Sequence, residues 1–482
     1  MIPRAALYAL VLLLGSALWS MVPALLFLTL GWKVDEAKWM GNPGFTGPWI
    51  EASLLIFLAG YWALLLRDRG PAKNGEPLLA AGFSLLFLYL GYTLLNFQDY
   101  LFLLKGHAVS FDGDGWIFLA TGVLLLANLL AQLLKDRARG EWALAATLVF
   151  LSALAFFSVH SFSLAGGYSN MLPMIEVWGR TLLHGHSPYG LKAIPGQQTD
   201  CCYLPGLWLA FLPAAAFNID SRFIEAIYTL FFAGVVWLAL RPRDRPLGSW
   251  FLVLFLLNPW SLLRQEDYFS PYLLSWACFF LALRRGRANL AAGCFGWGLS
   301  AHLFSWALLP VWVAWTAKRR GWGGAARELL WAVGAAALVI LPFVIWDPLG
   351  FFKTALLVWV EMTPAIGVSH FGLAAWMASW HKLLAVLAFV FMGTGTWAAW
   401  RGSGSLDSLF RWLAFSLGLV FLASYHIEHY YYFVPLALLL FHEIALLGRD
   451  GTVESGHENL PSNGEKPDAP GREITGTAKS GF

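Results

Sequence analysis

Long apolar runs, each about 15 to 25 residues and thus near the length of a membrane-crossing helix, recur along most of the chain. Short polar clusters separate them, and these clusters alternate between basic composition and acidic or mixed composition. Cytoplasmic loops of membrane proteins are enriched in Lys and Arg, so the alternation also predicts which side each cluster faces. The pattern predicts an all-α polytopic membrane protein with about 14 transmembrane helices and both termini in the cytoplasm.

The same pattern divides the chain into three parts. Residues 1–140 hold about four spans with few polar groups, which is typical of a lipid-facing transmembrane scaffold. Residues 141–447 hold the remaining spans and most of the polar residues found at span ends. The tail, 448–482, is polar and rich in Gly, Pro, Ser and Glu, so we expect a disordered cytoplasmic segment.

The polar stretch 161–203 follows the fifth apolar run, and the charge pattern places it outside. Inside it, Leu172, Ile175, Trp178 and Leu182 recur at helical spacing, which predicts a short helix lying on the membrane surface. Loops of this length are usually functional or disordered. We interpret this one as an ordered active-site or recognition loop, the alternative being a surface strut without chemistry.

After this loop, one segment conflicts with the alternation of charge. Residues 203–217 contain Pro205 and Pro213, and a full crossing there would put the basic cluster 241–245 outside. We therefore expect 203–217 to be re-entrant or partly embedded in the membrane. The apolar runs predict a span before the loop, at 141–160, and spans after it at 222–240, 249–263, 269–283, 288–317 (as two short halves), 328–345, 383–400, 408–424 and 433–447.

Composition supports a membrane protein and excludes other classes. The chain is 58% hydrophobic and 13% charged, whereas soluble proteins carry about 25% charged residues. The net charge of +3 comes from loops, and no basic face suited to nucleic acid is visible. The 4 cysteines form no disulfide framework, because Cys201 and Cys202 are adjacent and Cys278 and Cys294 lie in apolar runs.

Arg264, Gln265, Glu266 and Asp267 form the densest polar cluster in the apolar half of the chain. An arginine can hold a phosphate with two parallel hydrogen bonds, and a neighbouring acid can orient that arginine. The cluster is therefore a candidate phosphate or substrate site. The alternative is an ordinary outer loop with solvated charges.

Three histidines lie at predicted outer span ends. His302 stands between two short apolar half-helices, and broken helices present backbone dipoles and polar groups to anions, although a satisfied core histidine is the alternative. His426 and His429 lie three positions apart, with Glu428 between them, and would share a helix face. They suit binding of a donor phosphate or a sugar hydroxyl, or plain interfacial anchoring. Zinc is not indicated, since the spacing is not HExxH.

Several stretches together resemble a known family. The run His184-Gly185-His186-Ser187-Pro188-Tyr189, followed by Tyr203-Leu204-Pro205, resembles the G-x-x-P-Y … Y-x-P signature of GT-C-type integral membrane glycosyltransferases, especially their mannosyltransferase-like bacterial and archaeal branch. Further stretches similar to that branch follow in order, at Asn258-Pro259 with Arg264–Asp267, Gly296–Pro310 around His302 (where lysine is usual), Trp346–Leu357 and Ser424–Pro435.

The resemblance implies an enzyme that takes a sugar from a polyprenyl-phosphate-linked donor at the outer face, with an acid in the first long outer loop as the base. At the position of that acid this chain has Asn170 and Met171, and an asparagine cannot act as a general base. Catalysis therefore either uses another carboxylate or has been lost. The candidate bases are Glu176, Asp200, Glu266 and Asp267.

The resulting expectation is a plasma-membrane glycosyltransferase of cell-envelope glycan biosynthesis, moving a sugar with inversion to a lipid, glycan or protein acceptor at the extracytoplasmic side. Its partners are the lipid-linked sugar, the acceptor and membrane lipid; it needs no cofactor, and a divalent metal is compatible with the chemistry but not indicated. Candidates for donor-phosphate binding are Arg264, His302, His426 and His429. Candidates for substrate binding are Asn170, Tyr189, Tyr203, Gln265, His370 and Glu428.

Two other functions remain open. The first is a catalytically inactive GT-C-like protein that binds a lipid-linked glycan or scaffolds an assembly, which Asn170 favours. The second is a transporter or flippase, which the pattern disfavours because the polar groups lie on one side and no inverted repeat is evident.

Overall fold

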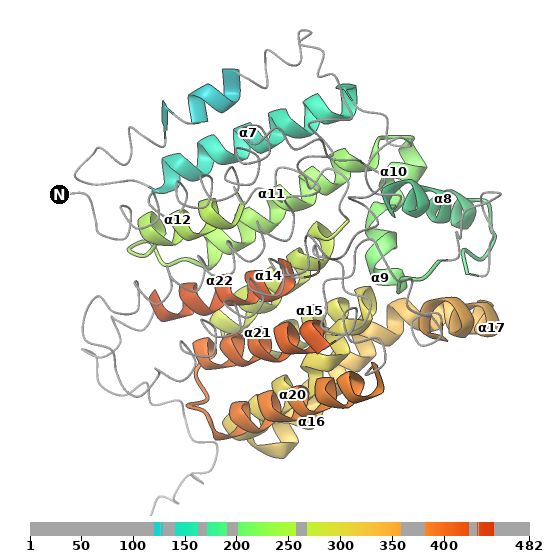
Figure 1. Cartoon of the computed structure of the whole chain (residues 1–482), viewed down its shortest axis with the longest axis vertical. Coiled ribbons are helices and arrows are strands. Elements are labelled where there is room, and N and C mark those ends of the chain that lie inside the picture. The colour runs from blue at the N-terminus through green and yellow to red at the C-terminus, as the bar shows by residue number, and fades with distance from the viewer. Residues whose placement is uncertain are drawn as a thin grey trace, which may run out of the picture.

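The computed structural model describes residues 120–125, 127–128, 140–161, 171–189, 201–256, 268–357, 381–423, 431 and 433–447. Within these ranges the regular structure is entirely helical, as the apolar pattern predicts, and there is no strand. Figure 1 shows the longer helices lying side by side, with several short helices gathered at one edge.

The helices form two groups. Those that lie side by side, called the long helices here, are α7 (Gly140–Ser161), α11 (Ser221–Ala239), α12 (Arg245–Leu256), α14 (Ser270–Arg284), α15 (Ala288–Ala301), α16 (Leu309–Trp346), α20 (His381–Arg401), α21 (Leu406–Ala423) and α22 (Phe433–Leu447). The remaining elements are α8 (Met171–Leu183), α9 (Pro205–Trp208), η2 (Leu209–Phe211), α10 (Leu212–Phe217), η4 (Leu303–Leu308), α17 (Pro348–Phe351) and the π-helical turn η5 (Phe352–Leu357).

Side chains distant in sequence meet at each end of the long helices. At one end the Tyr203 hydroxyl contacts those of Tyr268 and Tyr431, and the Tyr203 ring lies 5.9 Å from the His302 ring. We call this the tyrosine end and define it by Tyr189, Tyr203, Tyr268, Tyr431 and His302. The short helices α8, α9, α10 and α17 gather here, at the right of Figure 1.

At the opposite end two basic turns meet. One joins α11 to α12 and the other joins α14 to α15, and Arg284 Nη2 lies 3.7 Å from Asp244 Oδ2 between them. We call this the arginine end and define it by Arg241, Arg243, Arg245, Arg284 and Arg285. Helix α14 connects the two ends, because it begins beside the tyrosines and ends at Arg284.

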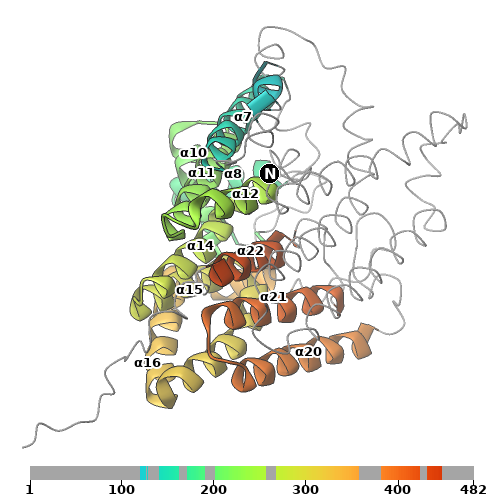
Figure 2. The ribbon, with the colours of Figure 1, turned by 90° about the vertical axis from the view of Figure 1, so that its left-hand side faces the viewer.

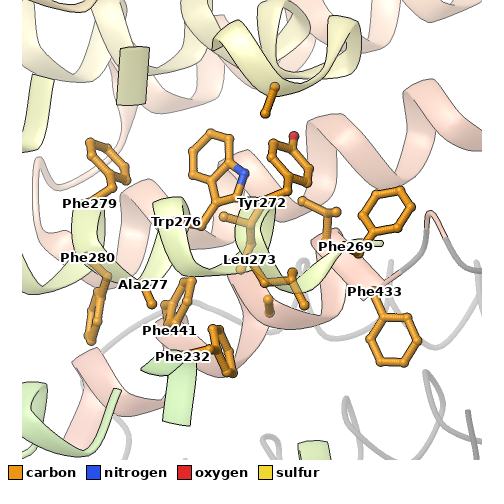
Figure 3. Packing of buried hydrophobic residues seen from close by; sticks show 14 of the residues in the cluster. Phe232, Phe269, Tyr272, Leu273, Trp276, Ala277, Phe279, Phe280, Phe433 and Phe441 are labelled. Carbon is orange, nitrogen blue, oxygen red and sulfur yellow. The ribbon is translucent and has the colours of Figure 1, made fainter. Parts of the chain in front are cut away.

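Helix α14 is the central element of the core, because its residues are buried on nearly every side. Figure 3 shows its aromatic side chains pointing toward neighbouring helices. The ring of Phe280 stacks on that of Phe441 in α22 at 5.0 Å, and Phe279 meets Phe295 of α15 edge-on at 5.3 Å. A helix that is apolar on all sides packs in this way only when other helices surround it.

Helix α16 turns a corner at Gly321, whose φ of 72° and ψ of 170° are not helical. The sequence pattern predicts a loop from Lys318 to about residue 327, but helix continues on both sides of this single glycine. The first half packs on α20 and α21, where Trp315 Nε1 donates to Ser405 O at 3.0 Å. Arg320 and the buried Glu328 form an ion pair across the corner. Figure 2 shows α16 and α20 at the edge of the molecule opposite α7.

The segment 203–217, predicted to be re-entrant or partly embedded, folds as the short helices α9, η2 and α10 rather than as one long helix. Both of its ends lie at the tyrosine end, since Tyr203 contacts Tyr268 and the following α11 starts beside Glu176. Helix α11 then leads to the arginine end at Leu240. This path places the cluster 241–245 opposite the tyrosine end, although 203–217 itself stays at the tyrosine end.

Two helical stretches of the described ranges are long and apolar enough to cross a membrane, Ser221–Ala239 and Leu303–Trp346. The Gly321 corner divides the second stretch, and its longer part extends from 322 to 346. At a rise of about 1.5 Å per residue this part is roughly 37 Å long, enough to cross a bilayer by itself.

Candidate functional site

The break between α15 and η4 positions His302. The residue has extended backbone angles, φ −146° and ψ 136°, and its Nδ1 accepts a hydrogen bond of 3.3 Å from the backbone N–H of Phe304. The imidazole therefore caps the start of η4, as side-chain acceptors do at helix N-termini. The sequence predicts that His302 stands between two short half-helices, and the break between α15 and η4 confirms this prediction.

Aromatic rings surround the imidazole, which is only 3% exposed. The nearest is the stacked ring of Phe304 at 4.8 Å, and Tyr431 meets the imidazole edge-on at 5.2 Å. The rings of Tyr203, Phe269 and Tyr272 lie 5.9, 5.9 and 5.7 Å away. Nε2 is buried and has no hydrogen-bond partner within the described ranges.

The contact with Phe304 fixes which nitrogen carries the proton. Because Nδ1 accepts a hydrogen bond, it is unprotonated, and the proton of the neutral ring lies on Nε2. His302 therefore presents a buried N–H donor rather than a cation. An unpaired buried donor costs about 1–3 kcal/mol, which an incoming oxygen acceptor would recover.

Three tyrosine hydroxyls meet beside this imidazole. The Tyr203 hydroxyl lies 2.5 Å from that of Tyr268 and 3.4 Å from that of Tyr431. These residues come from three separate parts of the chain, and all three are buried. The arrangement provides a run of polar atoms inside an otherwise apolar region of the protein.

Tyr189 joins the loop after α8 to the rest of the tyrosine end. Its hydroxyl donates to Tyr203 O at 3.1 Å and accepts from Trp208 Nε1 at 3.3 Å. Its ring meets Phe343 and Phe351 edge-on. Burial raises the pKa of Tyr189 well above its usual value. The hydroxyl predicted to bind substrate is thus already engaged within the protein.

The loop 184–189 is also tied to the end of α16. Ser187 Oγ donates to Asp347 Oδ2 at 3.1 Å, and Asp347 Oδ1 accepts from Gly350 N at 3.0 Å. Asp347 thereby caps α17 while holding the loop. These contacts tie the described part of the loop, 184–189, to the end of α16 and the start of α17.

Helix α8 forms where the apolar spacing predicts a short helix, and Leu172, Ile175 and Trp178 are buried. The apolar face packs on other parts of the protein, for example on Tyr203, whose ring lies 6.1 Å from that of Trp178. Helix α8 also lies close to α10, because a Cβ added at Gly179 would stand 2.9 Å from Ala215 Cβ. Protein, and not a membrane surface, therefore covers these buried side chains.

Glu176, one of the candidate bases, has two structural partners. Its Oε1 accepts from the backbone N–H of Ser221 at 3.1 Å, and its Oε2 lies 3.5 Å from Arg180 Nη2. The carboxylate thus caps the N-terminus of α11 together with Asp220, whose side chain accepts from Arg222 N. This geometry gives Glu176 a role in holding α8 to α11.

Of the residues predicted from sequence, Glu176, Tyr189, Tyr203 and His302 are described, and the structure brings Tyr189, Tyr203 and His302 together. The other candidates lie outside the described residues, so their roles stay predictions; they are Asn170, Asp200, Arg264, Gln265, Glu266, Asp267, His370, His426, Glu428 and His429. The described ranges contain no cluster of three or more His, Cys, Asp or Glu side chains suited to a metal.

Sequence reasoning missed Tyr268 and Tyr431 as site residues. Tyr268 follows directly after the polar cluster that ends at Asp267, and Tyr431 belongs to a run of three tyrosines. Tyrosines at span ends usually form an interfacial belt, so the run by itself does not indicate a site. One signal was available in the sequence: both tyrosines, like His302, fall at predicted outer ends of spans.

Comparisons with protein-family models, with curated proteins and with solved structures found no match to this chain.

Proposed function

We propose that the chain is a polytopic membrane glycosyltransferase of GT-C-like architecture, with about 14 crossings and cytoplasmic termini. It takes a sugar from a polyprenyl-phosphate donor and transfers it with inversion to a lipid, glycan or protein acceptor. The reaction occurs at the tyrosine end, which faces the extracytoplasmic side of the plasma membrane.

Exposed apolar faces support the membrane location. Leu338, Leu330 and Ile345 on the second half of α16 are 79%, 74% and 72% exposed, and Phe389 on α20 is 69% exposed. Soluble monomers rarely expose contiguous apolar surface on this scale. Lipid tails would cover these side chains, as they cover the outer faces of membrane helix bundles.

The distribution of charge supports the orientation. Basic residues gather at the arginine end and beside it, where Lys318 Nζ contacts the backbone oxygens of Arg401 and Gly402. Short loops on the cytoplasmic side of a membrane are enriched in Lys and Arg. An arginine end in the cytoplasm would put the tyrosine end outside. A donor carried by a polyprenyl chain would then meet His302 from the outer leaflet.

The observation that carries the proposal is the Nε2–H of His302, which has no hydrogen-bond partner in the part of the chain that the structure describes. It is a donor held at a helix break, within an aromatic shell, at the end of the bundle proposed to face outward. A phosphate oxygen would pair with it. Because it is a neutral donor, it would stabilise the leaving phosphate by hydrogen bonding and not by a full positive charge.

In the proposed reaction a carboxylate removes the proton from the acceptor hydroxyl, and the resulting oxygen attacks the anomeric carbon of the donor sugar. The bond from that carbon to the phosphate oxygen breaks on the opposite face, and the polyprenyl phosphate leaves with the electron pair. Glu176 is occupied by Ser221 and Arg180. The role of base therefore falls to Asp200, Glu266 or Asp267.

The test uses purified full-length protein in lipid vesicles with polyprenyl-phosphate hexoses labelled on the sugar. The His302→Ala variant should lose about 100-fold in transfer rate, the usual cost of removing one donor to a developing anion. His302→Gln, which keeps an N–H donor, should retain more activity than His302→Ala. The matched control is His442→Ala, because His442 lies at the arginine end, where its Nδ1 pairs with Asp407 O. Equal activity of the two alanine variants would refute the role of His302.

A second candidate function is lipid-glycan binding without catalysis. The engagement of Glu176 as a helix cap favours it, together with Asn170 at the position where the resembling enzymes have their acid. Saturable binding of the lipid-linked hexoses, without turnover in the wild type, would distinguish this function from transfer.

A further inference from the structure

Six arginines lie in or beside the two turns at the arginine end, and two of them, Arg243 and Arg284, approach Asp244. Arg241, Arg243 and Arg245 lie in or next to the turn between α11 and α12, and Arg284, Arg285 and Arg287 lie at the turn between α14 and α15. Arg241, Arg243 and Arg285 are all near enough to Arg284 to repel its charge. Positive charge at this density needs anions to balance it.

Asp244 does not satisfy the N–H donors of these two neighbouring arginines. Its carboxylate oxygens lie 3.5 Å from Arg243 Nε and 3.7 Å from Arg284 Nη2. Charge-assisted hydrogen bonds are shorter, about 2.7–2.9 Å. Within the described ranges Arg284 Nη2 is consequently a buried donor without a hydrogen-bond partner, although Arg284 Nη1 donates to Ile444 O at 3.1 Å.

Arg245 adds a second unpaired donor at the same junction. Its guanidinium carbon lies 3.9 Å from the ring centroid of Trp237, so the group is held over the indole. Its Nε is buried and has no partner among the described residues. Each of these two guanidinium groups therefore keeps an N–H donor for an oxygen acceptor, and phosphate oxygens are the acceptors that arginine commonly binds.

An apolar stripe on α11 leads to this junction. Ile227, Phe231 and Leu238 lie on one face of the helix and are 44%, 58% and 48% exposed. Arg285 Nη2 donates to Leu238 O at 3.3 Å, so the stripe ends beside the exposed Arg285. An acyl chain could lie along the stripe while its phosphate headgroup meets the arginines.

We propose that the arginine end holds the phosphate headgroup of an anionic phospholipid whose acyl chains lie against α11. Basic pockets between membrane helices bind lipid phosphates in this manner. Free phosphate offers the same oxygens but nothing to cover the apolar stripe, which favours the lipid as the ligand. The inference needs the chain to lie in a bilayer, but it holds whether or not the tyrosine end transfers a sugar.

The test measures binding of fluorescent phosphatidylglycerol to the full-length protein in a neutral detergent, with phosphatidylcholine and inorganic phosphate as competitors. We expect saturable binding that phosphatidylcholine does not displace and inorganic phosphate displaces poorly. The Arg243→Gln/Arg285→Gln variant, which changes two exposed arginines and keeps Arg284, should bind roughly fivefold more weakly for each charge removed.

The control variant is Arg401→Gln, which removes an exposed arginine outside the junction. Equal weakening by this control would mean general attraction of anions to a basic face, and it would overturn the proposal. Ready displacement by inorganic phosphate would overturn the lipid as ligand. If the double variant does not fold, Arg243→Gln alone provides the comparison, and wild-type affinity in that variant would overturn the proposal. This assay does not measure transfer of labelled sugar. A negative result for lipid binding would therefore leave the proposed enzyme activity untouched.

Discussion

The phenol of Tyr189 donates a hydrogen bond to the backbone carbonyl of Tyr203, with the two oxygens 3.1 Å apart. The same phenol oxygen accepts from Trp208 Nε1. One buried hydroxyl thereby joins the loop after α8 to the residues just before α9. This connection orders the loop beside the tyrosine hydroxyls around His302.

The Tyr189→Phe variant should be less stable than the wild type by about 1–3 kcal/mol. It leaves the buried indole N–H of Trp208 unpaired, and it leaves the Tyr203 carbonyl with only the weak Cys201 thiol as a donor. Denaturant unfolding of the full-length protein in detergent measures the change. Tyr228→Phe is the control, since Tyr228 is only half buried in α11. Equal stability of the Tyr189→Phe and Tyr228→Phe variants would show that the two contacts contribute nothing.

The buried position of Tyr189 also predicts a pH dependence. Burial, followed by the neighbouring Cys201 thiol, raises the pKa of Tyr189 well above its usual value. The unfolded chain ionises this phenol near its ordinary pKa of about 10, so the stabilisation is complete below pH 10 and is lost as the pH rises further. Unfolding measured between neutral and alkaline pH should show the advantage of wild type over Tyr189→Phe shrinking above about pH 10. A difference that stays constant would contradict the raised pKa.

The long helices could be predicted from the sequence because apolar runs and basic clusters mark their ends. The run predicted at 433–447 corresponds to α22, Phe433–Leu447, and the run at 269–283 corresponds to α14, Ser270–Arg284. The Gly321 corner could not be predicted in this way. It depends on one backbone conformation and on burial of Glu328 against Arg320, and neither changes the hydropathy pattern.

The shell around His302 shows a second limit of sequence patterns. Its break between two half-helices follows from the sequence, but the rings that surround it come from residues 203, 269, 272, 304 and 431. Their meeting depends on how the long helices pack. The sequence pattern also does not reveal the contact with the Phe304 N–H, whose bond to Nδ1 leaves a neutral ring.

The two roles suggested for Glu176 predict opposite results for two substitutions. As a cap on α11, Glu176→Ala should cost about 0.5–2 kcal/mol, whereas Glu176→Gln keeps an oxygen for Ser221 N and should restore most of that loss. As a catalytic base, both variants would lose transfer alike, since glutamine cannot take a proton. We expect the first result. Stability and labelled-sugar transfer measured on the same preparations decide between the two, and loss of transfer in a stable Glu176→Gln protein would restore Glu176 as the base.

Gly321 should be intolerant of any side chain, because φ 72° with ψ 170° is a region that essentially only glycine occupies. Gly321→Ala should destabilise the protein by about 1–3 kcal/mol. Gly323→Ala, two residues away in helix and with no heavy atom within 4 Å of the added methyl group, is the control. The Gly323→Ala change should leave the stability of the protein unchanged or raise it by up to about 1 kcal/mol. Thermal unfolding of both variants measures the difference, and equal behaviour would mean that the corner is not fixed by the glycine.

Close packing of α15 on the second half of α16 depends on Gly296. A methyl group there would stand 2.2 Å from the backbone oxygen of Ala332 and 2.8 Å from Ala335 Cβ, so the helices would have to separate. Gly296→Ala should therefore cost about 1–3 kcal/mol, the usual effect of overpacking. The matched control on the same helix is Gly293→Ala, which meets nothing within 4 Å and should gain up to about 1 kcal/mol from its higher helix propensity. Because α15 leads directly to His302, the Gly296 variant should also lower labelled-sugar transfer, while the Gly293 variant should not. Destabilisation by Gly293→Ala as large as that by Gly296→Ala would show that α15 and α16 do not meet at this glycine.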